Sequence, residues 1–150
     1  MGYFSSIPVR ENGQTFFYSW FNSLRTAGIA VESFLGGGFI GETSFTLANN
    51  QSAAANVTGL VMSSTSYKSA HIYAEVRRKT ATTEVISNGR LIIQYRDLTT
   101  SWELLDELSG DDDGVVFTVN SSGQVQYTSD NMSGGSYTGT IKFRAITFSA

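Results

Sequence analysis

The sequence predicts a mainly β protein: an antiparallel β-sandwich or jelly-roll domain, preceded by a short extended arm and an amphipathic helix. From Phe39 onward, apolar residues recur at every second position, which is the period of a half-buried strand. About eight such segments follow with polar turns between them, and this regular spacing is typical of sandwiches and jelly rolls. The composition agrees, because 15% charged residues is low against the usual value of roughly 25%.

The first 38 residues are predicted to form a unit of their own ahead of the β domain at 39–150. Pro8 restricts the residue before it to extended geometry, so the chain is expected to start with an extended arm. The three glycines at 36–38 are expected to end a helix and to act as a hinge.

A helix is predicted between the arm and the hinge, beginning at Ser19. Ser19 is a suitable N-cap, and the apolar residues that follow at steps of three and four fit both a packed helix and a coiled-coil seam. At about 16 residues the helix is marginal in water by itself, so it must pack on partner chains or fold back on the β domain. We favour a homotrimer, whose oligomer and anchor interface would be formed by Phe17, Trp20, Phe21, Leu24, Val31 and Leu35.

The clearest strand pattern lies at residues 66–80. Ala70, Ile72, Ala74 and Val76 alternate with polar and aromatic residues, so they are expected to share the face that points into the core. Similar but shorter patterns occur at 43–49 and 56–63. In the closing segment, 136–150, the residues expected on one face are Ile141, Phe143 and Ala145.

Two hairpins are predicted in the second half of the domain. Asn88 and Gly89 suit a type I′ turn between two strands within 82–96, and residues 121–123 suit a turn within 114–129. The segment 99–114 is ambiguous. It fits either a strand through Trp102 and Leu104 or a single helical turn, followed in both cases by an acidic loop.

The search for catalytic chemistry finds no constellation, and the chain is expected not to be an enzyme. His71 is the single histidine, and no Gly-x-Ser-x-Gly motif accompanies it, so we interpret it as a packed or surface strand residue. An acidic cluster offers oxygen ligands for calcium but lacks the spacing of an EF-hand, and a solvated turn is the favoured interpretation. No metal or cofactor is therefore predicted at Asp106, Glu107, Asp111, Asp112 and Asp113.

The net charge of −3 lacks the basic footprint of a nucleic-acid-binding protein, so no nucleic-acid partner is expected. No apolar run approaches the roughly 20 residues that span a bilayer, and the start of the chain has no signal-peptide pattern. We therefore expect a protein made in a cytoplasm that is not embedded in a membrane. The absence of cysteine excludes a disulfide framework.

Aromatic side chains on a β surface can stack on sugar rings, although cross-strand pairing or a subunit interface is the favoured interpretation. Tyr95 belongs to this group of rings. The candidate ligand contacts are Tyr67, Tyr73, Trp102, Tyr127 and Tyr137.

Two stretches resemble bacteriophage virion proteins. Residues 6–28, which contain "SWFNSLRTAG", are similar to the opening of many small phage virion proteins. Residues 114–145 contain a Val-x-Phe strand, "SGQVQYTS", a Gly-Gly turn and "KFRA". They are similar to the C-terminal head of phage fibre and appendage proteins and of related trimeric fibres in some bacteria.

This resemblance implies a small bacteriophage virion protein of the head-fibre or tail-appendage type: a trimeric fibre or decoration protein without enzymatic activity. Its N-terminal part would attach it to the capsid, portal or tail of the virion, and its β head would face outward. Because the chain has no shaft of repeats, we expect a short spike or knob. Heads of this type either decorate the particle or bind host-surface glycans, so a glycan- or receptor-binding tip is the alternative function.

Overall fold

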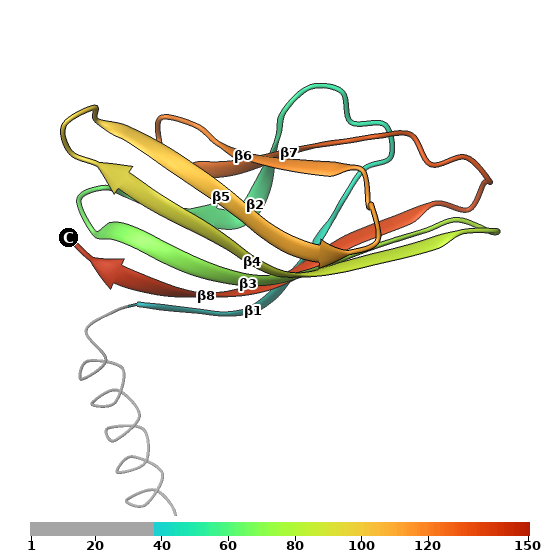
Figure 1. Cartoon of the computed structure of the whole chain (residues 1–150), viewed down its shortest axis with the longest axis horizontal. Helices are drawn as coiled ribbons and strands as arrows, with labels where there is room; N and C mark the ends of the chain where they lie inside the picture. Colours follow the sequence, from blue (N-terminus) through green and yellow to red (C-terminus); the bar gives the residue numbers. More distant parts are fainter. Residues whose placement is uncertain (1–37) are drawn as a thin grey trace, which may run out of the picture. The chain divides into compact units, whose positions relative to one another are not determined.

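The computed structural model describes residues 38–150 of the chain, and this part is built from β-strands (Figure 1). The predicted arm and helix, with the six predicted interface residues, lie outside the described residues. The strands are β1 Phe39–Thr46, β2 Ala55–Val61, β3 Tyr67–Lys79, β4 Glu84–Arg96, β5 Ser101–Gly110, β6 Val115–Val119, β7 Gln124–Ser129 and β8 Thr138–Ser149. The prediction of an antiparallel, mainly β domain is therefore confirmed, whereas its sandwich or jelly-roll form stays a prediction.

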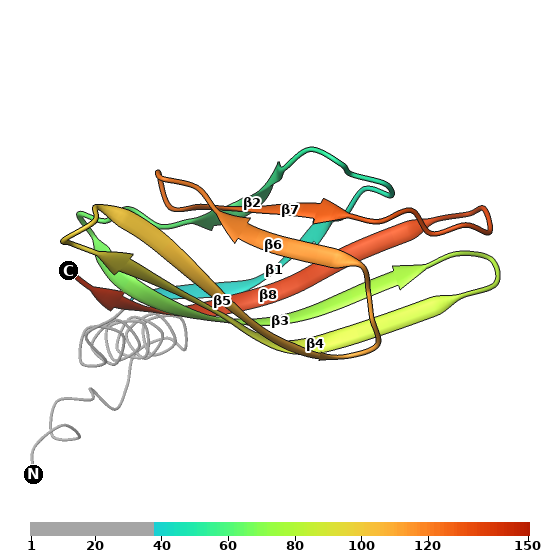
Figure 2. The same cartoon turned by 45° about the horizontal axis from the view of Figure 1, so that its top comes forward.

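The strands form two antiparallel sheets (Figure 2). One sheet has five strands in the order β1-β8-β3-β4-β5, and the other has three strands in the order β2-β7-β6. The three-stranded sheet covers one face of the five-stranded sheet in both views. The covered face is called the inner face here, and the opposite face of the five-stranded sheet is its outer face.

The inner faces of the two sheets share one apolar core. Ala70, Ile72, Ala74 and Val76 of β3 are all buried, as the alternation predicts. Inward-facing residues of β8 and of the three-stranded sheet complete the core and include Ile141, Phe143, Ala145, Val57, Phe117 and Val125. A period of two places every second residue on one face, so these strands keep a continuous set of inward side chains.

The predicted type I′ turn at Asn88 and Gly89 is wrong. Both residues lie in the middle of β4, where Gly89 pairs with Ala74 on one side and with Leu108 on the other. A Cβ atom at Gly89 would collide with the backbone carbonyl of Glu107, so glycine is required here by the close approach of a neighbouring strand. The turn lies earlier, at residues 80–83, where it connects β3 to β4.

Two further local predictions concern the segment 99–114 and the turn at 121–123. Residues 101–110 form strand β5, which resolves the ambiguous segment, and residues 121–123 form the turn of the β6–β7 hairpin. The Asn120 side-chain oxygen accepts hydrogen bonds from the backbone N–H groups of Ser122 (3.0 Å) and Gln124 (3.1 Å). An Asn side chain that bonds its own backbone in this way stabilises a tight turn.

Within residues 38–150, no helix has the length and apolar character that crossing a membrane requires.

Candidate interaction surface

The outer face of the five-stranded sheet carries a row of side chains that crosses all five strands and is apolar except for one histidine. The registers align Phe39 of β1 with Ile146 of β8, Ile146 with His71 of β3, His71 with Ile92 of β4, and Ile92 with Leu105 of β5. These five residues are called the apolar band. Because aligned residues of neighbouring strands lie about 5 Å apart, the band is a continuous strip perpendicular to the strands.

Three of the five band residues are exposed, and His71 and Ile92 are partly buried. Phe39 is 60% exposed, Leu105 56% and Ile146 43%. Of the eight exposed large hydrophobic residues in the described chain, these three belong to the band, and Tyr73 and Phe148 lie beside it on the same face. Surface apolar residues scattered singly are ordinary, but a contiguous patch with a polar border marks an interaction site.

Two aromatic residues widen the band. Phe148 packs edge-to-face against His71, with the ring centres 5.5 Å apart. On the other side, the guanidinium of Arg144 lies over the ring of Tyr73, 5.8 Å from its centre. Such contacts orient these side chains, and Tyr73 and Phe148 remain exposed.

A row with charged side chains borders the band on each side. One row, the arginine flank, consists of Arg144, Tyr73, Arg90 and Glu107, which align across β8, β3, β4 and β5. The other row, the glutamate flank, consists of Phe148, Ser69, Gln94 and Glu103 on the same strands. An apolar centre with a polar rim is the usual anatomy of a protein–protein interface.

Arg90, Glu107 and Glu103 of the two flanks form ion pairs within the chain, whereas Arg144 lies over the Tyr73 ring. Arg90 forms an ion pair with Glu107, and the hydrogen bond to that carboxylate raises the pKa of Arg90. Arg96 donates to Glu103 at 2.9 Å, and this bond, helped by one from Gln94, lowers the pKa of Glu103. All four charged groups are exposed, so each pair contributes orientation more than stability.

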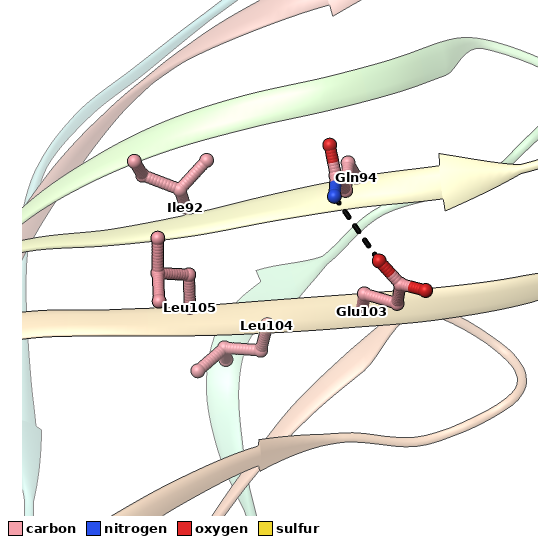
Figure 3. A pocket seen from close by; sticks show the side chains of 5 residues that line it. All are labelled: Ile92, Gln94, Glu103, Leu104 and Leu105. Carbon is pink, nitrogen blue, oxygen red and sulfur yellow. Dashed lines mark hydrogen bonds between the residues drawn. The ribbon is translucent and has the colours of Figure 1, made fainter.

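The glutamate flank and the apolar band border a shallow depression of about 600 Å³ over β4 and β5 (Figure 3). Ile92 and Leu105 point the same way from neighbouring strands, and the 3.1 Å hydrogen bond from Gln94 to Glu103 closes the depression at one end. Leu104 points to the other side of β5. The depression is apolar and open, and it contains no histidine, hydroxyl or amine among its lining residues.

A second group of polar residues lies at the end of the domain where the loops 48–54, 111–114 and 130–137 meet. Its centre is Arg78, which occupies an inward position on β3 and is 1% exposed. Arg78 donates hydrogen bonds to the carbonyl oxygens of Asp113 and Asp130, to the Asn49 side chain (3.2 Å) and to the Tyr137 hydroxyl (3.1 Å). Because these partners come from different loops, Arg78 fixes the loops relative to one another.

The acidic residues near these loops bind groups of the chain itself. Asp113 is buried and accepts a hydrogen bond from the Ser87 hydroxyl. Asp111 accepts from the backbone N–H of Ile86 (2.9 Å), and Asp112 accepts from that of Gly114 (3.2 Å). The sequence favoured a solvated turn for the whole acidic cluster, but Asp113 is buried and therefore does not fit that interpretation. Among the described residues, no three acidic or histidine side chains gather in a way that would hold a metal ion.

The structure places the predicted ligand contacts in different environments. Trp102 and Tyr127 are core residues, 8% and 3% exposed, so neither offers a ring face to a ligand. Tyr67 is half-buried against the core, and Tyr137 is half-buried beside Arg78. Tyr73, which is 40% exposed, is the predicted contact that lies on the outer face.

Sequence reasoning missed the band itself. The signal was present in β8, where the outward positions change from Lys142 and Arg144 to Ile146 and Phe148 toward the end of the strand. An apolar residue on the outward side of an otherwise alternating strand indicates a second contact surface. Only the core-facing set of this strand was used in the prediction.

Among solved structures, the chain is similar to the crystal structure of the Acinetobacter phage vB_ApiP_P1 tailspike protein, with a TM-score of 0.36 and 15% sequence identity. The likeness covers 77% of this chain and 21% of that one, so the chain spans about a fifth of that protein's length. No protein-family model and no curated protein matches the chain. A likeness this remote carries no argument about function.

Proposed function

We propose that the chain is a virion structural protein: a short trimeric fibre or decoration protein of a bacteriophage, attached through residues 1–38, with the β domain outward. The observation that supports the proposal best is the apolar band, because it presents exposed apolar side chains of neighbouring strands on one face of the domain. The resemblance of residues 6–28 and 114–145 to phage virion proteins is the reason for placing the chain in a phage particle. The attachment point is a capsid, portal or tail protein.

The chemistry of the described residues supports a structural role over an enzymatic one. His71 packs against the ring of Phe148 and is aligned with Ile146 of β8 and Ile92 of β4. Within residues 38–150, every buried side-chain nitrogen and oxygen has a hydrogen-bond partner. The buried polar residues hold loops in place, as Arg78 does.

Incorporation into particles tests the proposal. The full chain and a Trp20→Ser/Leu24→Ser variant would each be produced together with the other virion proteins encoded beside it, and the particles purified by density gradient. We expect the wild-type chain in the particle fraction and the variant in the free fraction, because the variant lacks two apolar anchor residues. Equal incorporation of both chains would contradict the anchoring role, and absence of the wild type from particles would contradict the proposed function.

The trimeric state has its own measurement. Light scattering on the eluted full chain should give three times the chain mass of 16.3 kDa. A monomer across the whole concentration range would contradict a trimer.

A specific observation favours the alternative function, a glycan- or receptor-binding tip. Tyr73 presents an exposed ring beside Arg144 and Arg90, and aromatic rings next to charged or amide side chains suit the apolar face and the hydroxyl groups of a sugar. A glycan array probed with the full chain tests this. Binding that is lost in Tyr73→Ala and kept in Tyr95→Ala would support the alternative, and no binder at high valency would contradict it.

A further inference from the structure

The backbone carbonyl of Gly38, at the entrance to the β domain, accepts two hydrogen bonds from one residue. The backbone N–H of Thr147 donates to this oxygen at 2.8 Å, and the Thr147 hydroxyl donates to it at 2.7 Å. Thr147 is 1% exposed and continues the inward side of β8 after Ile141, Phe143 and Ala145, which are all apolar. A buried hydroxyl needs a hydrogen-bond partner, and here that partner is the first residue that the structure describes.

Gly38 fits this place because it has no side chain. A Cβ atom there would lie 2.7 Å from the Thr147 hydroxyl oxygen and 3.0 Å from the Tyr67 hydroxyl oxygen. The Thr147 hydroxyl would then have to move away from the carbonyl that it binds. Gly38 is not among the glycines with positive φ, so the close approach of its neighbours, and not its backbone conformation, requires glycine.

Apart from this contact, the first section of β1 has few attachments. β1 is an edge strand, and its neighbour in the sheet is β8. The register of these two strands shifts between Ile40 and Thr43, so residues 39 and 40 are the ones that pair ahead of the shift. The side chain of Ile40 adds a partly buried contact with the core. Because a shift in register interrupts the ladder, this short section can open without the rest of the strand.

We propose that Gly38, Thr147 and Tyr67 form a clamp that fixes the point at which the attachment segment enters the β domain. The proposal rests on the proposed function, in which the preceding residues hold the chain on a virion, so that any pull on the domain acts at the start of β1. The end of a folded segment frays unless it is tied down, and the clamp ties it down. Gly38 then belongs to the β domain and not to the predicted hinge at 36–38.

Digestion of the full chain with chymotrypsin, which cleaves after aromatic residues, tests the clamp. Phe39 is 60% exposed and lies next to Gly38, and cleavage after it requires the start of β1 to open. The cleavage rate follows the population of the open form, and the fragment that begins at Ile40 is identified by its mass. We expect Thr147→Val to be cut there about fivefold faster than the wild type, because it lacks the hydroxyl donor. Gly38→Ala should be cut faster still, because its Cβ displaces that donor.

Two matched variants keep the clamp intact. Thr147→Ser retains the hydroxyl and should be cut after Phe39 more slowly than Thr147→Val. Gly41→Ala adds a Cβ to the same strand at a position with nothing within 4 Å, so it should be cut like the wild type. Cleavage after Phe117, in the other sheet, reports opening of the whole domain and should change less than cleavage after Phe39.

Equal cleavage after Phe39 in the wild type and Thr147→Val would overturn the clamp, as would equal rates in Thr147→Ser and Thr147→Val. A Gly41→Ala chain that is cut as fast as Gly38→Ala would overturn it as well. A parallel rise of cleavage after Phe39 and Phe117 would show a weakened domain instead of an opened clamp. A wild-type chain absent from particles would remove the proposed function and the pull that the clamp resists, whereas unchanged cleavage in the variants would remove the clamp alone.

Discussion

The inner and outer faces of the five-stranded sheet are formed by the same strands, yet they differ in what a substitution would change. On β3, Ile72 and Arg78 point inward and are buried, whereas Tyr73 and Arg77 point outward and are exposed. Neighbouring residues of one strand therefore belong to two environments. The inner face supplies the core on which folding depends, whereas the outer face is available for the contacts that we propose.

The largest contrast is expected between Arg78 and its neighbour Arg77. Arg78→Ala leaves the carbonyl oxygen of Asp113 without its Arg78 donor, and the carbonyl oxygen of Asp130 keeps only the backbone N–H of Asn50. An unsatisfied buried acceptor costs about 1–3 kcal/mol and each lost hydrogen bond from a charged group about 1.5–3 kcal/mol, so we expect a loss of about 4 kcal/mol in the free energy of unfolding. Arg77→Ala removes only exposed ion pairs with Glu75 and Glu84 and should cost less than about 1 kcal/mol. Urea unfolding followed by tryptophan fluorescence measures both. Similar losses in the two variants would contradict the structural role of Arg78.

The same substitution on the two faces gives the next contrast. Ile72→Ala leaves a cavity in the core, because Ile72 is fully buried, and should lower the free energy of unfolding by about 3 kcal/mol. Ile146→Ala removes a side chain that is 43% exposed, so in dilute solution its cost should stay below about 1 kcal/mol.

The two variants should also differ in how stability depends on concentration. Association stabilises the folded state more as the protomer concentration rises, and in the proposed oligomer Ile146→Ala would remove an exposed apolar side chain from the band. Unfolding midpoints measured over a range of chain concentrations should therefore rise less steeply for Ile146→Ala than for the wild type. An unchanged slope would argue against a contact at the band.

The smallest effect is expected at Glu103, on the border of the outer face. The hydrogen bonds from Arg96 and Gln94 hold the pKa of Glu103 below its ordinary value of 4.5. A lowered folded-state pKa contributes stability that is present above the unfolded-state pKa and is lost as the pH falls through the folded-state pKa. The difference in unfolding midpoint between the wild type and Glu103→Gln should therefore shrink on acidification. Because the pair is exposed, added salt should reduce the difference as well. A difference that grows in acid would contradict this assignment.

Much of the inner face follows from the sequence. The period of two in residues 66–80 identifies Ala70, Ile72, Ala74 and Val76 as one buried set, because alternation and burial are linked by the geometry of a strand. The period of two also places Arg78 on the inward side of β3. From the sequence alone, however, a charged residue at such a position suggests that the strand has ended, because its hydrogen-bond partners are not visible there. Those partners, among them Asp113, Asp130 and Tyr137, come from distant parts of the chain.

The misassigned turn has a similar cause. An Asn-Gly pair is favoured in a type I′ turn because both residues tolerate positive φ, but glycine is also chosen where another backbone comes close. At Gly89 the second reason applies, since the neighbouring strand β5 leaves no room for a side chain. The sequence contains the glycine, and only the packing of β5 against β4 shows why it is there.

By itself, the sequence determined that residues 39–150 form antiparallel strands and which side chains of the clearest strands turn inward, because these properties depend on local alternation. The tertiary structure alone decided that Phe39, Ile146, His71, Ile92 and Leu105 form one row. Each of these residues comes from a different strand, and their alignment depends on the register of four strand pairs. Register is a long-range property, because shifting one strand by a single residue would turn its outward side chains to the core. The candidate interaction surface is therefore a product of strand pairing.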